Sequence, residues 1–125
     1  MAKATSCKDA IARWEMAHPG LKVEEAEKVE LWGQCPPIEK MDSALNALKA
    51  CRHLALSTNC IDKIGALSGL ERLEVLSLGR NQLKKIENLD SVAGSLQELW
   101  LSYNQIDRLV RAEMKSQEIG GVEVG

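Results

Sequence analysis

Side chains that could perform catalysis or hold a metal ion are few in this chain. It contains two histidines, His18 and His53, and four cysteines separated by 28, 16 and 9 residues. Those separations match no zinc-ligand pattern, and no glycine-rich phosphate loop is present. The repeat that organises the chain brings no Ser/His/acid or Cys/His set together. We therefore expect no enzyme, no metal and no cofactor, and we expect free thiols in a reducing, intracellular compartment.

Tryptophan, tyrosine and arginine offer a different chemistry, because these residue types are enriched at the energetic centres of protein–protein interfaces. The chain has three tryptophans, one tyrosine and no phenylalanine. Trp32, Arg80, Trp100 and Tyr103 stand at variable positions of a recurring phrase. Nothing in a packed core requires them at these positions, so they indicate a protein-binding surface.

The recurring phrase joins two leucines to one asparagine and occurs three times, at intervals of 22 and 23 residues. In L-x-L the side chains alternate across a strand, so both leucines point into the core. The asparagine amide both donates and accepts, and it can satisfy backbone groups of the neighbouring coil. This is the pattern of a leucine-rich repeat. The three clear copies are LALSTNCIDKI (54–64), LSLGRNQLKKI (76–86) and LWLSYNQIDRL (99–109), with Asn59, Asn81 and Asn104 predicted to form a ladder.

The predicted fold is an α/β leucine-rich-repeat solenoid with a short parallel sheet on its concave face. Helices or 3₁₀ turns are expected on the convex face, from segments such as LSGLERL (67–73) and LDSVAGSL (89–96). A degenerate first copy, KVELWGQCPPI, places Val29 and Leu31 at the strand positions and Gln34 at the asparagine position. The glutamine is one methylene longer and is expected to fit less well.

An N-terminal capping helix is expected within residues 1–21, since a terminal helix commonly covers the open end of a solenoid. Ser6 and Asp9 give a start signal for a helix over residues 6–21, and Pro19-Gly20 stops it. A partner-binding amphipathic helix is the alternative interpretation of this element.

The repeats, one degenerate and three clear, are predicted to span residues 22–109. Residues 110–125 depart from the pattern and are expected to form a divergent, flexible tail. With no further copy of L-x-L, the strand at LWLSYN is expected to present an open parallel edge.

Outward positions of the stacked strands form the concave face, which is the usual binding face of a solenoid. The predicted columns of neighbours are Lys28–His53–Val75–Glu98, Glu30–Ala55–Ser77–Trp100 and Trp32–Ser57–Gly79–Ser102, with Thr58, Arg80 and Tyr103 beside them. Small residues between the aromatic ones leave room for a protruding partner element. The predicted partner-binding residues are Trp32, His53, Val75, Arg80, Glu98, Trp100 and Tyr103.

Composition excludes several other classes of partner. Hydrophobic residues make up 45% of the 125 residues and charged residues 27%, which fits one globular domain. The net charge is −2 without blocks of like charge, so neither nucleic acid nor an anionic membrane is an expected partner. No segment approaches the roughly 18 consecutive apolar residues of a membrane span. The opening residues MAKATSCKDAIARWEMA lack the apolar region of a signal peptide.

Several phrases carry a family resemblance that generic repeats do not. KVELWGQCPPIEKMD, LKACRHLALSTNCIDKI, LSLGRNQLKKIENL and LQELWLSYNQIDRL together resemble the light chain 1 family of axonemal outer-arm dynein over residues 1–109. The resemblance implies a non-catalytic subunit that docks on the dynein heavy chain near its microtubule-binding stalk tip and modulates ciliary motility. A contact with tubulin follows from that position. The implied location is the cytoplasm, cytoskeleton and axoneme of a cilium or flagellum.

The family pattern continues past Leu109 through further repeats and a C-terminal cap, which this chain does not match, so no functional residue is carried over from that part. Two alternatives stay open from the residues themselves. One is a general leucine-rich-repeat interaction adaptor, for instance of a phosphatase-regulatory type. The other is a truncated isoform with impaired binding.

Overall fold

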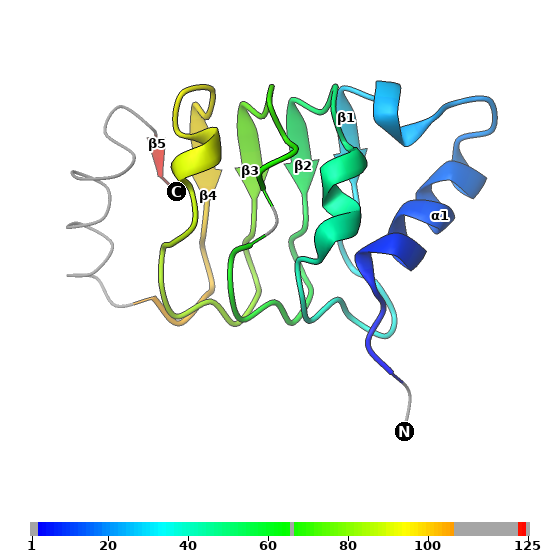
Figure 1. Ribbon diagram of the computed structural model, residues 1–125. Helices are drawn as coiled ribbons and strands as arrows, with labels where there is room; N and C mark the ends of the chain where they lie inside the picture. The colour runs from blue at the N-terminus through cyan, green and yellow to red at the C-terminus, as the bar shows by residue number, and fades with distance from the viewer. Residues whose placement is uncertain (1–2, 66, 107–122, 125) are drawn as a thin grey trace.

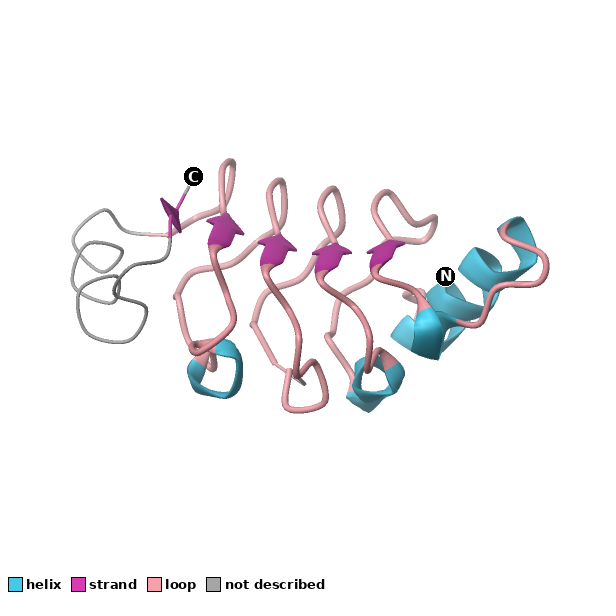
Figure 2. Cartoon of the chain, turned by 90° about the horizontal axis from the view of Figure 1, so that it is seen from above, coloured by secondary structure: helices cyan, strands magenta, loops and turns pink. Residues whose placement is uncertain are grey.

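The computed structural model describes residues 3–65, 67–106 and 123–124. Five short strands stand side by side in one parallel sheet in the order β1-β2-β3-β4-β5, and the short helices lie on the opposite side of the coils (Figures 1 and 2). The predicted solenoid is therefore confirmed. Its elements are α1 (Cys7–Ala17), η1 (Val23–Glu25), β1 (Lys28–Glu30), η2 (Ser43–Ala47), β2 (His53–Ala55), β3 (Val75–Ser77), η3 (Asp90–Val92), β4 (Glu98–Trp100) and β5 (Glu123–Val124).

The inward strand positions align in one column, as the L-x-L phrase predicts. Val29 pairs with Leu54, Leu54 with Leu76, and Leu76 with Leu99. All four side chains are fully buried, and the second leucine of each phrase joins them in one aliphatic core. Because every coil contributes the same residue to the same layer, burial in one coil depends on its neighbours.

The predicted asparagine ladder is present, and it joins each coil to the one before it. The Oδ1 atom of Asn81 accepts from the backbone N–H of Ile61 at 3.0 Å. Its Nδ2 atom donates to the carbonyls of Leu56 and Leu78, each at 3.0 Å, one in the preceding coil and one in its own. Asn59 and Asn104 repeat the arrangement one coil to either side. These amides satisfy backbone groups that the turn would otherwise leave buried and unpaired.

Gln34 occupies the asparagine position of the first coil and behaves differently, as expected from its length. Its Nε2 atom reaches the carbonyls of Leu31 and Trp32 only at 3.4 and 3.5 Å. Its Oε1 atom has no earlier coil to contact and accepts instead from the guanidinium of Arg13 on α1, at 3.0 Å. The longer side chain thus ties the first coil to the helix that precedes it.

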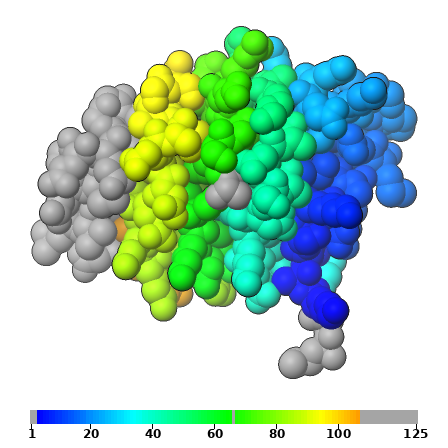
Figure 3. Space-filling model, viewed as in Figure 1, coloured from blue at the N-terminus to red at the C-terminus, as the bar shows by residue number. Residues whose placement is uncertain are grey.

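Helix α1 covers the N-terminal end of the solenoid, as Figure 1 and the space-filling view in Figure 3 show. Ser6 is its N-cap and accepts from the backbone N–H of Asp9, so the predicted start is confirmed. The helix ends at Ala17, earlier than the predicted residue 21. Its buried side chains join the core of the repeats: Cys7, Ala10, Ile11 and Trp14.

The cap is fastened by Asp42, at the end of the PPIEKMD phrase. One carboxylate oxygen accepts from the backbone N–H of Cys7 at 3.0 Å, at the start of α1. The other oxygen accepts from the N–H of Ala44 at 2.9 Å, at the start of η2. A single side chain therefore caps two helix N-termini, which a negative charge favours.

The convex side carries 3₁₀ structure, as predicted. Residues 89–96 contain η3, whereas residues 67–73 form successive turns closed by bonds from Leu70 N–H to the Leu67 carbonyl and from Leu73 N–H to the Leu70 carbonyl. The chains approach closely here, since a Cβ atom on Gly69 would lie 2.6 Å from the backbone of Asn46. Gly69 is thus required for the coils to pack.

The expectation of an open edge at the last repeat strand is wrong. Strand β5 pairs in parallel with β4, with Glu98 opposite Glu123 and Leu99 opposite Val124. Val124 follows Leu99 by 25 residues, the same interval that separates Val29 from Leu54. Of the predicted tail 110–125, only β5 belongs to the described residues, and the remainder lies outside them. Within the described part, no helix is long and apolar enough to cross a bilayer.

The cysteines are free, as expected, but they occupy contrasting environments. Cys7 and Cys51 are fully buried, whereas Cys35 is exposed and Cys60 half-buried. Burial raises the pKa of the Cys7 thiol to about 11, and burial likewise raises the pKa of Cys51 to about 11. The low-dielectric core disfavours the thiolate form in both cases.

Asn81→Ala is expected to lower the free energy of unfolding by about 3 kcal/mol, because each orphaned buried backbone group costs about 1–3 kcal/mol. Urea unfolding followed by circular dichroism measures the loss. Gln82→Ala is the matched control: its side chain is exposed, and we expect a change within about 0.5 kcal/mol. Equal losses at both positions would contradict the ladder as the source of stability.

Native protein at pH 8 is expected to show two fast thiols out of four with Ellman's reagent, and four in urea. A thiol of pKa about 11 is ionised at that pH in only about one molecule in a thousand, and the thiolate is the nucleophile. Substituting Cys35→Ser and Cys60→Ser together should remove the fast phase. Four thiols reacting at one rate in native buffer would refute the assignment.

Candidate functional site

The outward positions of the sheet form the candidate binding surface, and its columns follow the predicted register. His53 lies opposite Lys28 and Val75, and Val75 lies opposite Glu98. In the neighbouring column, Ser77 lies between Ala55 and Trp100. The predicted concave face is therefore assembled from the positions that the sequence indicated. We use "concave face" below for Lys28, Glu30, Trp32, His53, Ala55, Ser57, Val75, Ser77, Gly79, Arg80, Glu98, Trp100, Ser102 and Tyr103.

Large aromatic side chains stand exposed at the two ends of this face. The exposed fraction is 55% for Trp32 on the first coil, and 41% and 74% for Trp100 and Tyr103 on the coil of β4. Each of these side chains exposes a large apolar area. His53, Val75 and Glu98 are half-buried in the column beside them, so they offer partial contact area.

Small residues form the floor between the aromatic ends. Ala55 is only 7% exposed, and Ser57, Ser77 and Gly79 are half-buried. A Cβ atom on Gly79 would lie 3.3 Å from the carbonyl of Ser102, so the backbones of these two coils approach closely. The face therefore carries large aromatic side chains at both ends and small residues between them.

A column of left-handed residues borders the face, and sequence reasoning did not identify it. The residue before each ladder position has a positive φ: 61° at Gly33, 57° at Thr58, 56° at Arg80 and 62° at Tyr103. This conformation is uncommon outside glycine and is a genuine outlier for a β-branched residue such as Thr58. The sequence indicated this left-handed conformation only through Gly33, which occupies the position that the later coils fill with larger residues.

The last two members of this column interact with each other. The guanidinium carbon of Arg80 lies 4.5 Å from the centre of the Tyr103 ring, which is a cation–π contact. Both side chains are exposed. Backbone strain of this kind persists where surrounding structure over-determines it, and it concentrates at binding sites. The pair therefore forms a preorganised corner beside Trp100.

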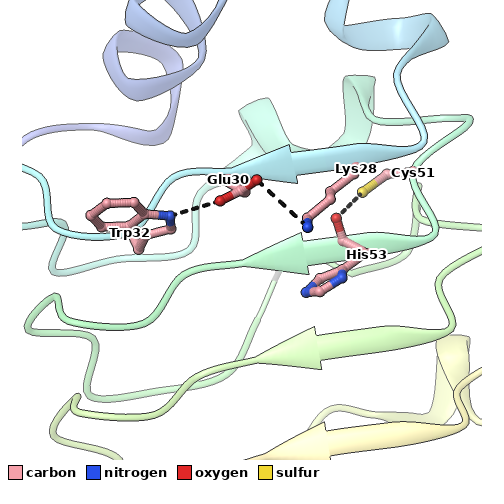
Figure 4. A network of polar contacts seen from close by, with 5 residues as sticks. All are labelled: Lys28, Glu30, Trp32, Cys51 and His53. Atoms are coloured by element: carbon pink, nitrogen blue, oxygen red, sulfur yellow. Dashed lines mark hydrogen bonds and ion pairs between the residues drawn. The ribbon is translucent and has the colours of Figure 1, made fainter.

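The opposite end is held by a polar network on β1, which Figure 4 shows. The indole N–H of Trp32 donates to the carboxylate of Glu30 at 3.0 Å, and Lys28 lies 3.8 Å from the other oxygen. The hydrogen bond from Trp32 is the main cause that lowers the pKa of Glu30 below its ordinary value. His53 faces the network from β2, and its own carbonyl accepts from the Cys51 thiol at 3.3 Å. The network orients the exposed indole.

The structure does not bring all seven predicted residues into one cluster. Trp32 lies on the first coil, whereas Arg80, Trp100 and Tyr103 gather on the last two. Among the described residues, no group of three or more His, Cys, Asp or Glu side chains is placed to hold a metal ion. The exposed groups of the face are aromatic, cationic and small polar side chains.

Comparison with known proteins also indicates a leucine-rich-repeat protein. The family described as leucine rich repeats (2 copies) matches residues 49–91. Dynein axonemal light chain 1 of Chlamydomonas reinhardtii is 64% identical over 102 residues, covering 82% of this chain and 51% of that protein. Dynein axonemal light chain 1 of Homo sapiens is 52% identical over 98 residues, covering 78% and 51%. The chain spans about half the length of the curated relatives it matches.

Solved structures agree on the fold. A leucine-rich-repeat protein of Leptospira interrogans superposes with a TM-score of 0.62 at 24% identity, over 71% of this chain and 23% of that one. An internalin of Listeria monocytogenes superposes with a TM-score of 0.53 at 26% identity, over 70% and 25%. The chain thus has the leucine-rich-repeat fold, and over 82% of its length it is similar in sequence to dynein axonemal light chain 1.

Proposed function

We propose that this chain is a non-catalytic binding subunit of axonemal outer-arm dynein in a cilium or flagellum. It docks on the dynein heavy chain near the microtubule-binding stalk tip and modulates motility. A contact with tubulin follows from that position. The observation that carries the proposal is the 64% identity to a protein named dynein axonemal light chain 1. The aromatic walls and small-residue floor of the concave face support docking rather than catalysis.

The docking surface would work by burying its aromatic anchors. Trp32 and Trp100 stand at opposite ends of the face, so a partner helix or loop laid across the strands contacts both. Arg80 places a cation at the same end as Trp100, where it would bind an acidic or aromatic group of the partner. Preorganisation of these side chains lowers the entropy lost on binding.

Modulation of the motor would follow from unequal binding to its states. A ligand shifts a conformational equilibrium only by its difference in affinity for the two conformations. The solenoid is rigid, because every coil is tied to the next by strand pairing and by the ladder. A rigid subunit that fits one arrangement of the stalk tip better than the other would therefore bias binding to the track.

The direct test is a calorimetric titration of this chain with the isolated stalk-tip domain of an outer-arm dynein heavy chain. Circular dichroism first establishes that the chain is folded. The proposal expects a one-to-one complex. A folded chain that shows no heat of binding to the stalk tip at any concentration tested would overturn it.

Trp100→Ala is expected to weaken binding to the stalk tip by about 2 kcal/mol, the cost of removing a typical aromatic hot spot. The same titration measures it. Met16→Ala is the matched control, because Met16 is 82% exposed on α1 and lies outside the concave face. An unchanged affinity in Trp100→Ala would remove Trp100 from the site.

Tyr103→Gly is expected to weaken binding while leaving stability within about 1 kcal/mol, because loss of the cation–π contact is offset by relief of left-handed strain. Thr58→Gly relieves the same strain in the same column, two coils away, and removes only a small side chain, so binding should stay unchanged and stability should rise. Urea unfolding and calorimetry give both quantities. A large loss of stability in Tyr103→Gly would show that the tyrosine is structural.

A further inference from the structure

A cleft on the other side of the turns is not used by the concave face. It has a volume of about 430 Å³ and lies between the coils that follow β2 and β3. We call it the lysine cleft, and its lining consists of Asp62, Lys63, Lys84, Lys85, Glu87 and Asn88. It shares no residue with the concave face, so whatever it binds can be tested separately from dynein docking.

The lining contains three lysines and two carboxylates, although the whole chain carries a net charge of −2. The lysines are exposed. Within the described ranges, the ion pairs join Lys28 to Glu30, and Arg52 to Glu27 and Glu74. In those same ranges, none of the three lysines is paired with Asp62 or Glu87, so their charges are available to a ligand.

The backbone beneath these lysines is held rigidly. In the phrases I-D-K-I and L-K-K-I, the exposed pairs lie between side chains that are at most 1% exposed. The Asn81 amide holds the N–H of Ile61, and the Asn104 amide holds that of Leu83. At the far side, Asn88 has φ 57° and donates to the Ile64 carbonyl at 2.7 Å. A ligand therefore meets a preformed site and orders only the lysine side chains.

We propose that the lysine cleft binds a short acidic peptide segment of a partner protein. The three lysines come from two coils, and the lining contains no arginine fork, which a compact phosphate group favours. An extended peptide presents side chains on one face every two residues, about 7 Å apart, while adjacent coils are about 4.8 Å apart. Flexible lysine side chains span that difference. Asp62 and Glu87 keep the interaction moderate and sensitive to salt.

Binding of fluorescein-labelled hexaglutamate, followed by fluorescence anisotropy, tests the proposal with the full chain. At an ionic strength of about 0.01 M charges act over about 30 Å, so binding should be strongest there and fall as salt rises. The double variant Lys63→Glu/Lys85→Glu should weaken binding about tenfold, equivalent to about 1.4 kcal/mol. Lys63→Arg/Lys85→Arg should retain it. Labelled hexalysine should not bind the cleft.

The matched control is Lys8→Glu/Lys22→Glu, which changes the net charge by the same amount at exposed positions outside the cleft. At an ionic strength of about 0.1 M, where charges act over only about 10 Å, its affinity for hexaglutamate should stay within about twofold of the unsubstituted chain. Trp100→Ala should also bind normally. Equal weakening in the control would overturn the proposal in favour of non-specific attraction. Pyrophosphate binding without hexaglutamate binding would overturn it in favour of a phosphate site.

Discussion

Each coil of this protein has backbone N–H and carbonyl groups at its turn that find no hydrogen-bond partner in the backbone of the same coil. The asparagine amide supplies those hydrogen bonds, and the rest of the structure depends on it. Asn81 bonds one N–H and one carbonyl of the coil before it and two carbonyls of its own. The asparagine amide carries a two-hydrogen donor and a carbonyl acceptor on one short side chain, so it can bond several backbone groups at once. The coil interval of 22 or 23 residues, the parallel register and the stacked leucine columns all follow from repeating this joint.

The same joint determines where functional side chains are displayed. Burying the amide requires the chain to turn away from the strand, and the residue before it takes a left-handed conformation in every described coil. That residue points outward beside the concave face. In the first coil it is Gly33, and in the last two it is Arg80 and Tyr103, which form a cation–π pair. The scaffold accepts strain at these positions, and the side chains placed there are available for recognition.

The two candidate surfaces differ in chemistry because they lie on opposite sides of that turn. Before it, strand alternation displays aromatic walls over a floor of small residues, which suits an apolar or mixed protein partner. After it, the exposed pairs between buried isoleucines and leucines are charged, and three lysines gather in one cleft. The proposed role of the first surface draws on the similarity to dynein axonemal light chain 1, which covers about half of that protein's length. The proposed role of the second surface is argued from charge and geometry alone.

The sequence by itself determined the solenoid, the columns of the concave face, the ladder and the capping helix, because these follow from periodicity and from the side-chain alternation of strands. It also indicated which positions differ between the repeats and are therefore predicted to contact a partner. The pairing of β5 with β4 escaped it, because Glu123–Val124 is too short to repeat the whole phrase and only the register identifies it. The double cap by Asp42, the Arg80–Tyr103 contact and the lysine cleft were decided only in three dimensions. Each joins residues from different coils or elements, and the distance between such residues depends on how the coils stack.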